Sequence, residues 1–134
     1  MKHEKLILND LPENISAFEL ATLVSNKASS VGFDWQDNNE VLTKLDEEIN
    51  ELQAAMSISD AAINEELGDV LFTLVNFAKH AGIDPEQALM MACEKFISRF
   101  NGMEKAAVAI DLKLNDLSRA QFENLWQLQK LKKS

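Results

Sequence analysis

Helix-capping pairs recur along this sequence, and they constrain the fold more than any other feature. Ser16 stands three residues before Glu19, and Ser118 stands three residues before Gln121. In such a pair the first side chain caps the start of a helix and the second bonds back to the capping residue. Only four glycines and two prolines are available to interrupt helices, and no segment long enough to build a sheet alternates polar and apolar residues. The sequence therefore predicts an all-α fold.

Five helices are expected, arranged as one helical bundle with a four-helix core. The first is predicted from residue 17 to about 31, and the second from a cap at 37 to about 56. The third is predicted from 60 to about 81, the fourth from 85 to at least 100, and the last from a cap at 118 toward the C-terminus. A chain of 134 residues suits one compact domain, which we predict over residues 1–134.

The charge balance excludes some partners. Twenty-two acidic against thirteen basic residues give a net charge of −9, which would repel the phosphate backbone of nucleic acids. A small anionic ligand stays compatible with this charge if a divalent cation is bound. No apolar run is long enough for a signal peptide or a membrane span. The single Cys93 is expected to be a packed thiol without a disulfide partner, and the protein is expected to be cytoplasmic.

A line of polar residues follows the otherwise apolar third helix. Its members recur at spacings of three and four residues, and they are Glu66, Asp69, Thr73, Asn76 and His80. A buried carboxylate without a partner costs several kcal/mol, so Glu66 and Asp69 need a cation, a basic side chain or solvent. A metal site, a buried ion pair and a solvent-filled groove all satisfy this requirement.

The second helix carries Glu48 and Glu51 one turn apart, on the flank of its apolar stripe. Alone, this pattern is also that of an ordinary solvated helix face. A short turn over residues 57–60 would place the second and third helices antiparallel, with Glu47 and Glu65 just outside the contact. Four carboxylates would then converge: Glu48, Glu51, Glu66 and Asp69. Such an all-oxygen cluster suits Mg²⁺ or Mn²⁺ rather than Zn²⁺.

These residues resemble the signature of the MazG nucleoside triphosphate pyrophosphohydrolases, a family of all-α NTP pyrophosphatases. The signature E-E-x-x-E followed by E-x-x-D is matched by residues 47–51 and 66–69. Further matching blocks are Val31-Gly32-Phe33-Asp34-Trp35, Gly68-Asp69-Val70-Leu71-Phe72 with Val75-Asn76, Lys95-Phe96 with Arg99-Phe100, and Leu125-Trp126. The resemblance covers about residues 17–130 and one MazG unit, as in the short one-domain members.

The resemblance implies a reaction and a metal site. The reaction is hydrolysis of a nucleoside triphosphate to a nucleoside monophosphate and pyrophosphate, in a house-cleaning role. The implied Mg²⁺ ligands are Glu48, Glu51, Glu66 and Asp69, with Glu47 and Glu65 as acidic support. Glu47 is a further catalytic candidate, as an acceptor of the proton from water. The resemblance also implies a homo-oligomer, a dimer or a tetramer, which agrees with a third helix that is apolar on many faces.

Seven residues are candidates for nucleotide contacts: Lys27, Phe33, Trp35, Lys44, Asn76, Lys95 and Arg99. Lys44 could instead pair with Glu48 on its own helix, and both aromatic residues could be anchors at the edge of the core. Two positions depart from the family pattern, since Cys93 replaces a common asparagine and Asn26 a common glutamine.

Two other functions fit the same sequence. One is a pyrophosphatase specialised for a single nucleotide such as dCTP or dUTP. The other is a non-catalytic helical interaction protein, which would also explain the apolar third helix. Measuring turnover of a panel of nucleotides distinguishes these two functions from general hydrolysis of nucleoside triphosphates.

Overall fold

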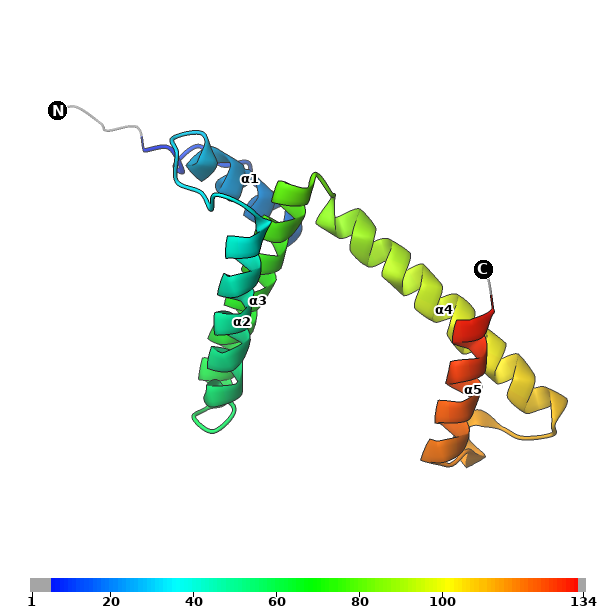
Figure 1. Cartoon of the computed structure of the whole chain (residues 1–134). Helices are drawn as coiled ribbons and strands as arrows, with labels where there is room; N and C mark the ends of the chain where they lie inside the picture. Colours follow the sequence, from blue (N-terminus) through cyan, green and yellow to red (C-terminus); the bar gives the residue numbers. More distant parts are fainter. Residues whose placement is uncertain (1–5, 133–134) are drawn as a thin grey trace. The chain divides into compact units, whose positions relative to one another are not determined.

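The computed structural model of this chain describes residues 6–132. Those residues form five α-helices and one 3₁₀ turn, with no strand among them (Figure 1). The elements are α1 (Ala17–Ser29), α2 (Asn38–Ala55), α3 (Asp60–Ala81), α4 (Pro85–Ala109), η1 (Leu114–Asp116) and α5 (Arg119–Leu131). The predicted all-α fold of five helices is confirmed. None of the helices in the described range is long and apolar enough to cross a membrane.

The helices begin at the predicted caps. The Ser16 hydroxyl accepts a hydrogen bond from the Glu19 backbone N–H at 3.1 Å. At the start of α5 the capping box is complete, because Ser118 Oγ accepts from the Gln121 N–H at 3.1 Å and Gln121 Oε1 accepts from the Ser118 N–H at 2.8 Å. Each cap satisfies a backbone donor that the helix itself leaves unpaired. Local sequence therefore sets where the helices start.

The third helix has the bounds that the sequence predicts. It begins after Ser59, whose hydroxyl accepts from the Ala62 N–H at 3.1 Å. It ends at Gly82, which has a left-handed backbone with φ of 69°. The N–H of Ile83 then donates to the Ala78 carbonyl at 2.9 Å, so the last turn is closed by backbone bonds. The first helix is shorter than predicted and ends at Ser29 instead of residue 31, because the N–H groups of Val31 and Gly32 bond to carbonyls three residues back and no longer four.

The chain divides into two compact units, Met1–Glu86 and Gln87–Ser134, and each is described by itself. The prediction of one domain stays a prediction. In the first unit α2 and α3 form an antiparallel hairpin and α1 packs against α3 (Figure 1). The core of this unit is small, and its buried apolar side chains are Val41, Ala55, Val75 and Ala78. Within this hairpin the carboxylates of α2 and α3 are brought side by side.

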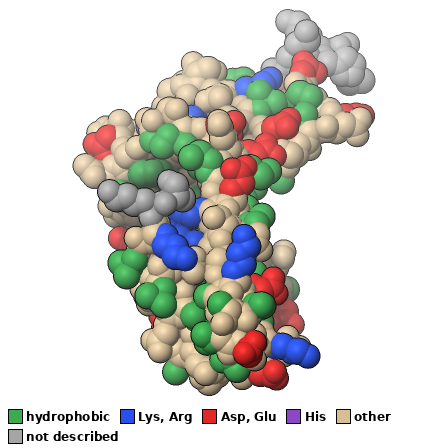
Figure 2. All heavy atoms as spheres, turned by 90° about the vertical axis from the view of Figure 1, so that its right-hand side faces the viewer, with side chains coloured by type: hydrophobic (Ala, Val, Ile, Leu, Met, Phe, Trp, Pro, Cys, Tyr) green, Lys and Arg blue, Asp and Glu red, His purple; other side chains and the backbone are tan. Residues whose placement is uncertain are grey.

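The faces of α3 are used differently from the sequence expectation. Thr73 and Asn76 from the polar line are buried, whereas Leu67 and Leu71 are 44% and 45% exposed. The reason is that α1 and α2 cover only one side of α3 within the first unit, and that side carries the polar line. Figure 2 shows hydrophobic side chains at the surface of the chain, beside acidic and basic ones. Apolar residues on the other faces of α3, such as Leu67 and Leu71, are therefore only partly covered within the first unit.

In the second unit, aromatic residues join α4 to α5. The ring centroids of Phe96 and Trp126 lie 5.4 Å apart, and those of Phe96 and Phe100 lie 6.1 Å apart. Cys93 is exposed on α4, so the prediction of a packed thiol is wrong. Met103 and Ala107 are the buried residues of α4, whereas Leu89, Met90 and Met91 nearer its start are 50% to 63% exposed.

Candidate active site

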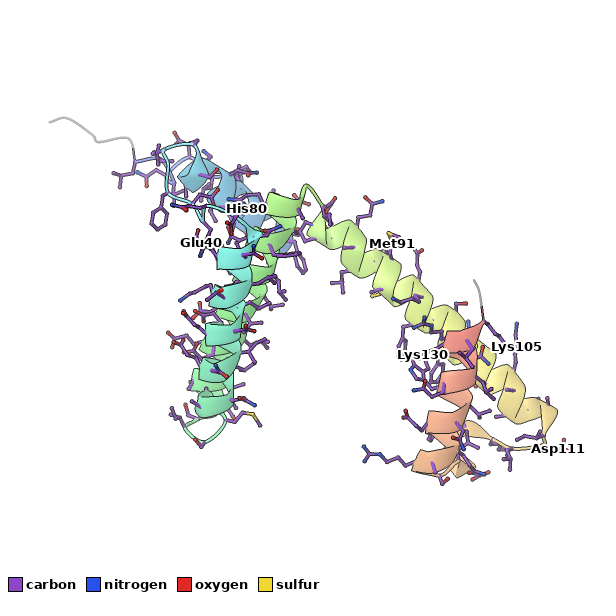
Figure 3. All side chains as sticks on the ribbon, viewed as in Figure 1. Glu40, His80, Met91, Lys105, Asp111 and Lys130 are labelled. Atoms are coloured by element: carbon purple, nitrogen blue, oxygen red, sulfur yellow. The ribbon has the colours of Figure 1, made fainter. Side chains whose placement is uncertain are left out.

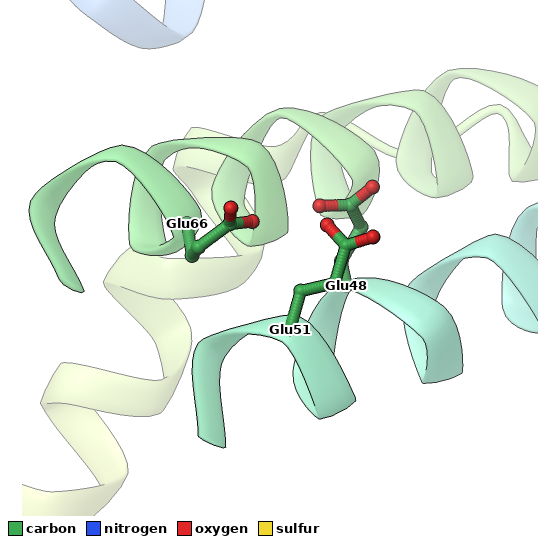
Figure 4. Close-up of side chains that lie close together, drawn as sticks. All are labelled: Glu48, Glu51 and Glu66. Carbon is green, nitrogen blue, oxygen red and sulfur yellow. The ribbon is translucent and has the colours of Figure 1, made fainter. Parts of the chain in front are cut away.

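Three carboxylates meet where α2 and α3 lie side by side. Glu48 and Glu51 extend from α2 and Glu66 extends from α3 (Figure 4). One oxygen from each of the three lies within 4.8 Å of the others. Residues three apart on a helix share a face, so Glu48 and Glu51 point together toward α3. The structure thus brings together three of the four carboxylates that the sequence singles out as metal ligands.

Burial makes this cluster unusual. Glu48 is only 5% exposed, and its Oε1 accepts a hydrogen bond from Lys44 Nζ at 2.9 Å. Its other oxygen, Oε2, is buried and has no hydrogen-bond partner among the described residues. Glu66 Oε2 is likewise buried and has no hydrogen-bond partner among the described residues. A buried acceptor without a partner costs about 1–3 kcal/mol, and a cation bound in the cluster would supply the missing partner.

The electrostatics of the cluster also favour a bound cation. Partial burial raises the pKa of Glu66 above its ordinary value, and the nearby charges of Glu51, Asp69 and Glu48 raise it further. The pKa of Lys44 is raised because its ammonium donates to Glu48 and lies near the charges of Glu48, Glu47 and Glu51. The three carboxylates therefore repel one another, and a cation between them would relieve that repulsion.

The other acidic residues lie around this cluster. Asp69 is exposed, one turn after Glu66 on α3, and it is not among the three carboxylates that meet within 4.8 Å. Its charge nevertheless acts on Glu66, whose pKa it helps to raise. Glu47 is exposed and lies 3.7 Å from Lys44 Nζ. Glu65 is also exposed on α3.

The loop before α2 places Trp35 in a cavity along α2. Trp35 is half-buried and lines an open cavity of about 460 Å³. The same cavity is lined by Thr43, Lys44 and Glu47 of α2. Lys44 therefore belongs both to the Trp35 cavity and to the ion pair with Glu48. Phe33 is 78% exposed, so within the described residues it is not a core anchor.

Asn76 and Lys27 occupy different surroundings. Asn76 is 1% exposed, its Oδ1 accepts from the Ser25 hydroxyl, and its Nδ2 donates to the Phe72 carbonyl at 3.1 Å. The oxygen of this amide thus joins α3 to α1, and its nitrogen bonds to the preceding turn of α3. Lys27 is half-buried in the last turn of α1, and its ammonium makes no hydrogen bond or ion pair with the residues that the structure describes.

Lys95 and Arg99 belong to the second unit. Lys95 is exposed on α4. The guanidinium carbon of Arg99 lies 5.9 Å from the centroid of the Trp126 ring, which is a cation–π contact. Trp126 in turn packs on Phe96, so these three side chains form one cluster between α4 and α5.

Sequence reasoning missed a role for Asp34 and Lys79. Asp34 Oδ2 lies 3.0 Å from Lys79 Nζ, and Asp34 Oδ1 lies 2.8 Å from His80 Nε2. These residues are separated by 45 and 46 positions, so no local spacing reveals the pairs. The only signals were an aspartate in the loop and a Lys-His pair in the last turn of the third helix.

The central part of the chain matches a known protein family. The MazG nucleotide pyrophosphohydrolase domain matches residues 36–103, about half of the chain. This chain belongs to the MazG family. The matched segment contains α2, α3 and all the carboxylates of the MazG signature.

Relatives of this MazG chain carry names of the same kind. It is 36% identical to the "Nucleoside triphosphate pyrophosphohydrolase/pyrophosphatase MazG" of Thermotoga maritima, over 84% of this chain and 44% of the relative. It is 36% identical to the "Nucleoside triphosphate pyrophosphohydrolase" of Escherichia coli K12, over 94% of this chain and 49% of the relative. A 64-residue segment is 41% identical to the "Uncharacterized protein YabN" of Bacillus subtilis, over 48% of this chain and 13% of the relative. The chain spans less than half the length of these curated relatives.

Proposed function

We propose that this chain hydrolyses nucleoside triphosphates to nucleoside monophosphates and pyrophosphate, with Mg²⁺ or Mn²⁺ as cofactor. The observation that carries the proposal is the cluster of Glu48, Glu51 and Glu66, with two buried oxygens that have no partner among the described residues. Family membership and the names of the relatives support the choice of reaction.

The residues of the cluster fit a hard divalent cation. All donors are carboxylate oxygens, which Mg²⁺ and Mn²⁺ prefer. Glu48, Glu51 and Glu66 would hold the ion, with Asp69 as the fourth ligand from the adjacent turn of α3. When bound, the cation would polarise the phosphates and lower the pKa of an attacking water.

Other side chains have roles around this centre. Glu47 is exposed near the cluster and accepts the proton of the attacking water. The ammonium of Lys44 neutralises the triphosphate, and the Trp35 ring provides a stacking surface for the base. Lys27, Lys95 and Arg99 are further candidates for contacts with the triphosphate. We place Asn76 outside the nucleotide site, because both ends of its amide are occupied within the fold.

The experiment that tests the proposal is an incubation with a panel of canonical and modified nucleoside triphosphates, with Mg²⁺, Mn²⁺ or EDTA. We expect nucleoside monophosphate and pyrophosphate in equal amounts, only in the presence of metal. Glu66→Gln should abolish turnover, and Glu104→Gln, an exposed residue on α4, should leave it unchanged. Release of nucleoside diphosphate and phosphate would assign a different reaction.

The same panel decides between the alternatives. Turnover of one nucleotide alone, for example dCTP or dUTP, would identify a specialised pyrophosphatase. Nucleotide binding without turnover, or no binding, would favour a helical interaction protein. Polymeric nucleic acid is not a proposed substrate, because the net charge of −9 opposes it.

We also propose a cytoplasmic homodimer or homotetramer. Apolar residues of α3 such as Leu67, Leu71 and Phe72 are 40% to 45% exposed, which leaves an apolar surface for a second copy. Sedimentation equilibrium at micromolar concentration should give a mass of at least twice that of one chain. A single species with the mass of one chain would contradict this proposal.

A further inference from the structure

The loop of residues 30–37 joins α1 to α2 and carries Trp35. Its central residue, Asp34, binds the C-terminal end of α3 through Lys79 at 3.0 Å and His80 at 2.8 Å. Figure 3 labels His80 at this end of α3, and Glu40 near the start of α2 at the same end of the hairpin. The Glu40 carboxylate accepts from the backbone N–H of Gln36, so the loop is also tied to α2.

The side chains of the Asp34 ion pairs are partly shielded from solvent. The side chains of Asp34, Lys79 and His80 are 22%, 12% and 17% exposed. Lys79 Nζ also lies 3.5 Å from the carbonyl oxygen of Ser25 on α1, to which it donates. Ion pairs that are partly buried and connected in a network hold their geometry better than isolated surface pairs. Asp34 therefore ties the loop to α3, and Lys79 ties the same place to α1.

Asp34 acts directly on the backbone of Trp35. Asp34 Oδ1, which binds His80, also accepts a hydrogen bond from the Trp35 N–H at 2.8 Å. The Trp35 ring lines the cavity that it shares with Lys44, and Lys44 binds Glu48 of the carboxylate cluster. Hydrogen bonds thus link the end of α3 to the Trp35 backbone, and Trp35 shares a cavity with Lys44, which binds Glu48 of the candidate active site.

We propose that Asp34 is a positioning residue for nucleotide binding, which through its contacts with Lys79 and His80 holds Trp35 in place beside Lys44. The inference rests on the proposed function, because Trp35 is the surface on which the base stacks. Asp34 is not one of the three clustered carboxylates. Its loss should therefore weaken nucleotide binding and leave the chemical step almost unchanged.

The first test needs no nucleotide. Trp126→Phe leaves Trp35 as the single tryptophan, so that acrylamide quenching reports on the Trp35 ring alone. In this background Asp34→Asn should raise the quenching constant about two-fold, because a released loop exposes a half-buried ring. The matched control is Asp10→Asn, which changes an exposed aspartate in the same unit and should leave quenching unchanged. Unchanged quenching in Asp34→Asn would overturn the proposal.

The second test measures kinetics in the chain with both tryptophans. Asp34→Asn should raise KM about 5- to 30-fold and change kcat less than about two-fold. The same substitution added to Trp35→Ala should raise KM no further, because Asp34 acts through Trp35. A full additional rise in KM in the Trp35→Ala background would overturn the proposal. If the wild-type chain turns over no nucleotide, the proposed function fails, and quenching still decides whether Asp34 holds Trp35.

Two further variants cover the case in which Asp34→Asn does not fold. Lys79→Met and His80→Gln each remove one of the two partners of Asp34 and leave its bond to the Trp35 N–H available. Each should raise the quenching constant of Trp35 by less than the loss of both partners would. Wild-type quenching in both variants would contradict the proposed role of the α3 contacts.

Discussion

Replacing Glu48 with glutamine should stabilise the metal-free chain, although Glu48 is a proposed metal ligand. Glu48 is 5% exposed, and its Oε2 is buried without a hydrogen-bond partner among the described residues. Glutamine has nearly the same shape, keeps an oxygen for Lys44, and offers an NH₂ group that can donate to Glu51 or Glu66. The substitution therefore replaces a repulsive contact with a hydrogen bond.

The magnitude follows from the distances in the cluster. Two like charges within 4.8 Å repel by about 3 kcal/mol at an effective dielectric constant of 20. Solvent around the exposed Glu51 screens part of this repulsion. Loss of the charged pair with Lys44, whose side chain is 40% exposed, costs about 0–1 kcal/mol. We expect a net gain of about 1–2 kcal/mol in the free energy of unfolding, or about 3–6 °C in Tm.

Bound metal should make the wild type more stable than Glu48→Gln. Ligand at a concentration of one hundred times its Kd stabilises a folded protein by about 2.7 kcal/mol. Wild-type protein should gain this stabilisation from Mg²⁺ or Mn²⁺, whereas Glu48→Gln has lost a ligand and should gain little. Thermal unfolding followed by circular dichroism should therefore show the variant melting higher in EDTA and the wild type melting higher in saturating metal.

The matched control for this experiment is Glu104→Gln, which neutralises an exposed carboxylate on α4. It should follow the wild type in both buffers. The reasoning is refuted if Glu48→Gln melts below the wild type in EDTA, since the ion pair with Lys44 would then outweigh the repulsion. Equal stabilisation of variant and wild type by metal would remove Glu48 from the metal site.

Three further predictions concern other parts of the first unit. Trp35→Ala should raise KM about 5- to 150-fold for all nucleotides with a smaller effect on kcat, because stacking is similar in the ground and transition states. A variant with lower thermal stability and a normal KM would show that Trp35 is a structural residue. Burial alone would raise the pKa of Asp34, but hydrogen bonds from His80, Lys79 and the Trp35 N–H outweigh it and lower the pKa to about 2. The pKa of Asp34 in the folded state lies below its unfolded value of about 3.9, so ionised Asp34 stabilises the fold above about pH 4 and this stabilisation is lost as the pH falls toward 2. The free energies of urea unfolding of wild type and Asp34→Asn should therefore differ at pH 7 and converge near pH 2. Asn76→Ala should lower the free energy of unfolding by about 1–3 kcal/mol, because it leaves Ser25 unpaired inside the fold, and KM of the folded enzyme should stay constant; a large rise in KM with normal stability would restore Asn76 to the nucleotide site.

Local sequence determined the helices and the main chemical feature of this protein. The caps at Ser16 and Ser118 and the turn at Gly82 set helix ends, because capping and backbone preference act within a few residues. The spacing of Glu48 and Glu51 placed both on one face of α2, and the short turn before α3 brought Glu66 opposite them. Each of these features depends on neighbours in the chain, and so each could be predicted from the sequence.

Tertiary packing decided which faces and which distant residues meet. The polar line of α3 turned toward α1 and α2, so Asn76 is buried and paired with Ser25, while Leu67 on another face is exposed. Asp34 meets His80 across 46 positions only because α1 and its following loop pack on the end of α3. Such contacts depend on the positions of whole helices, and a periodic pattern within one helix cannot specify which partner will cover each of its faces.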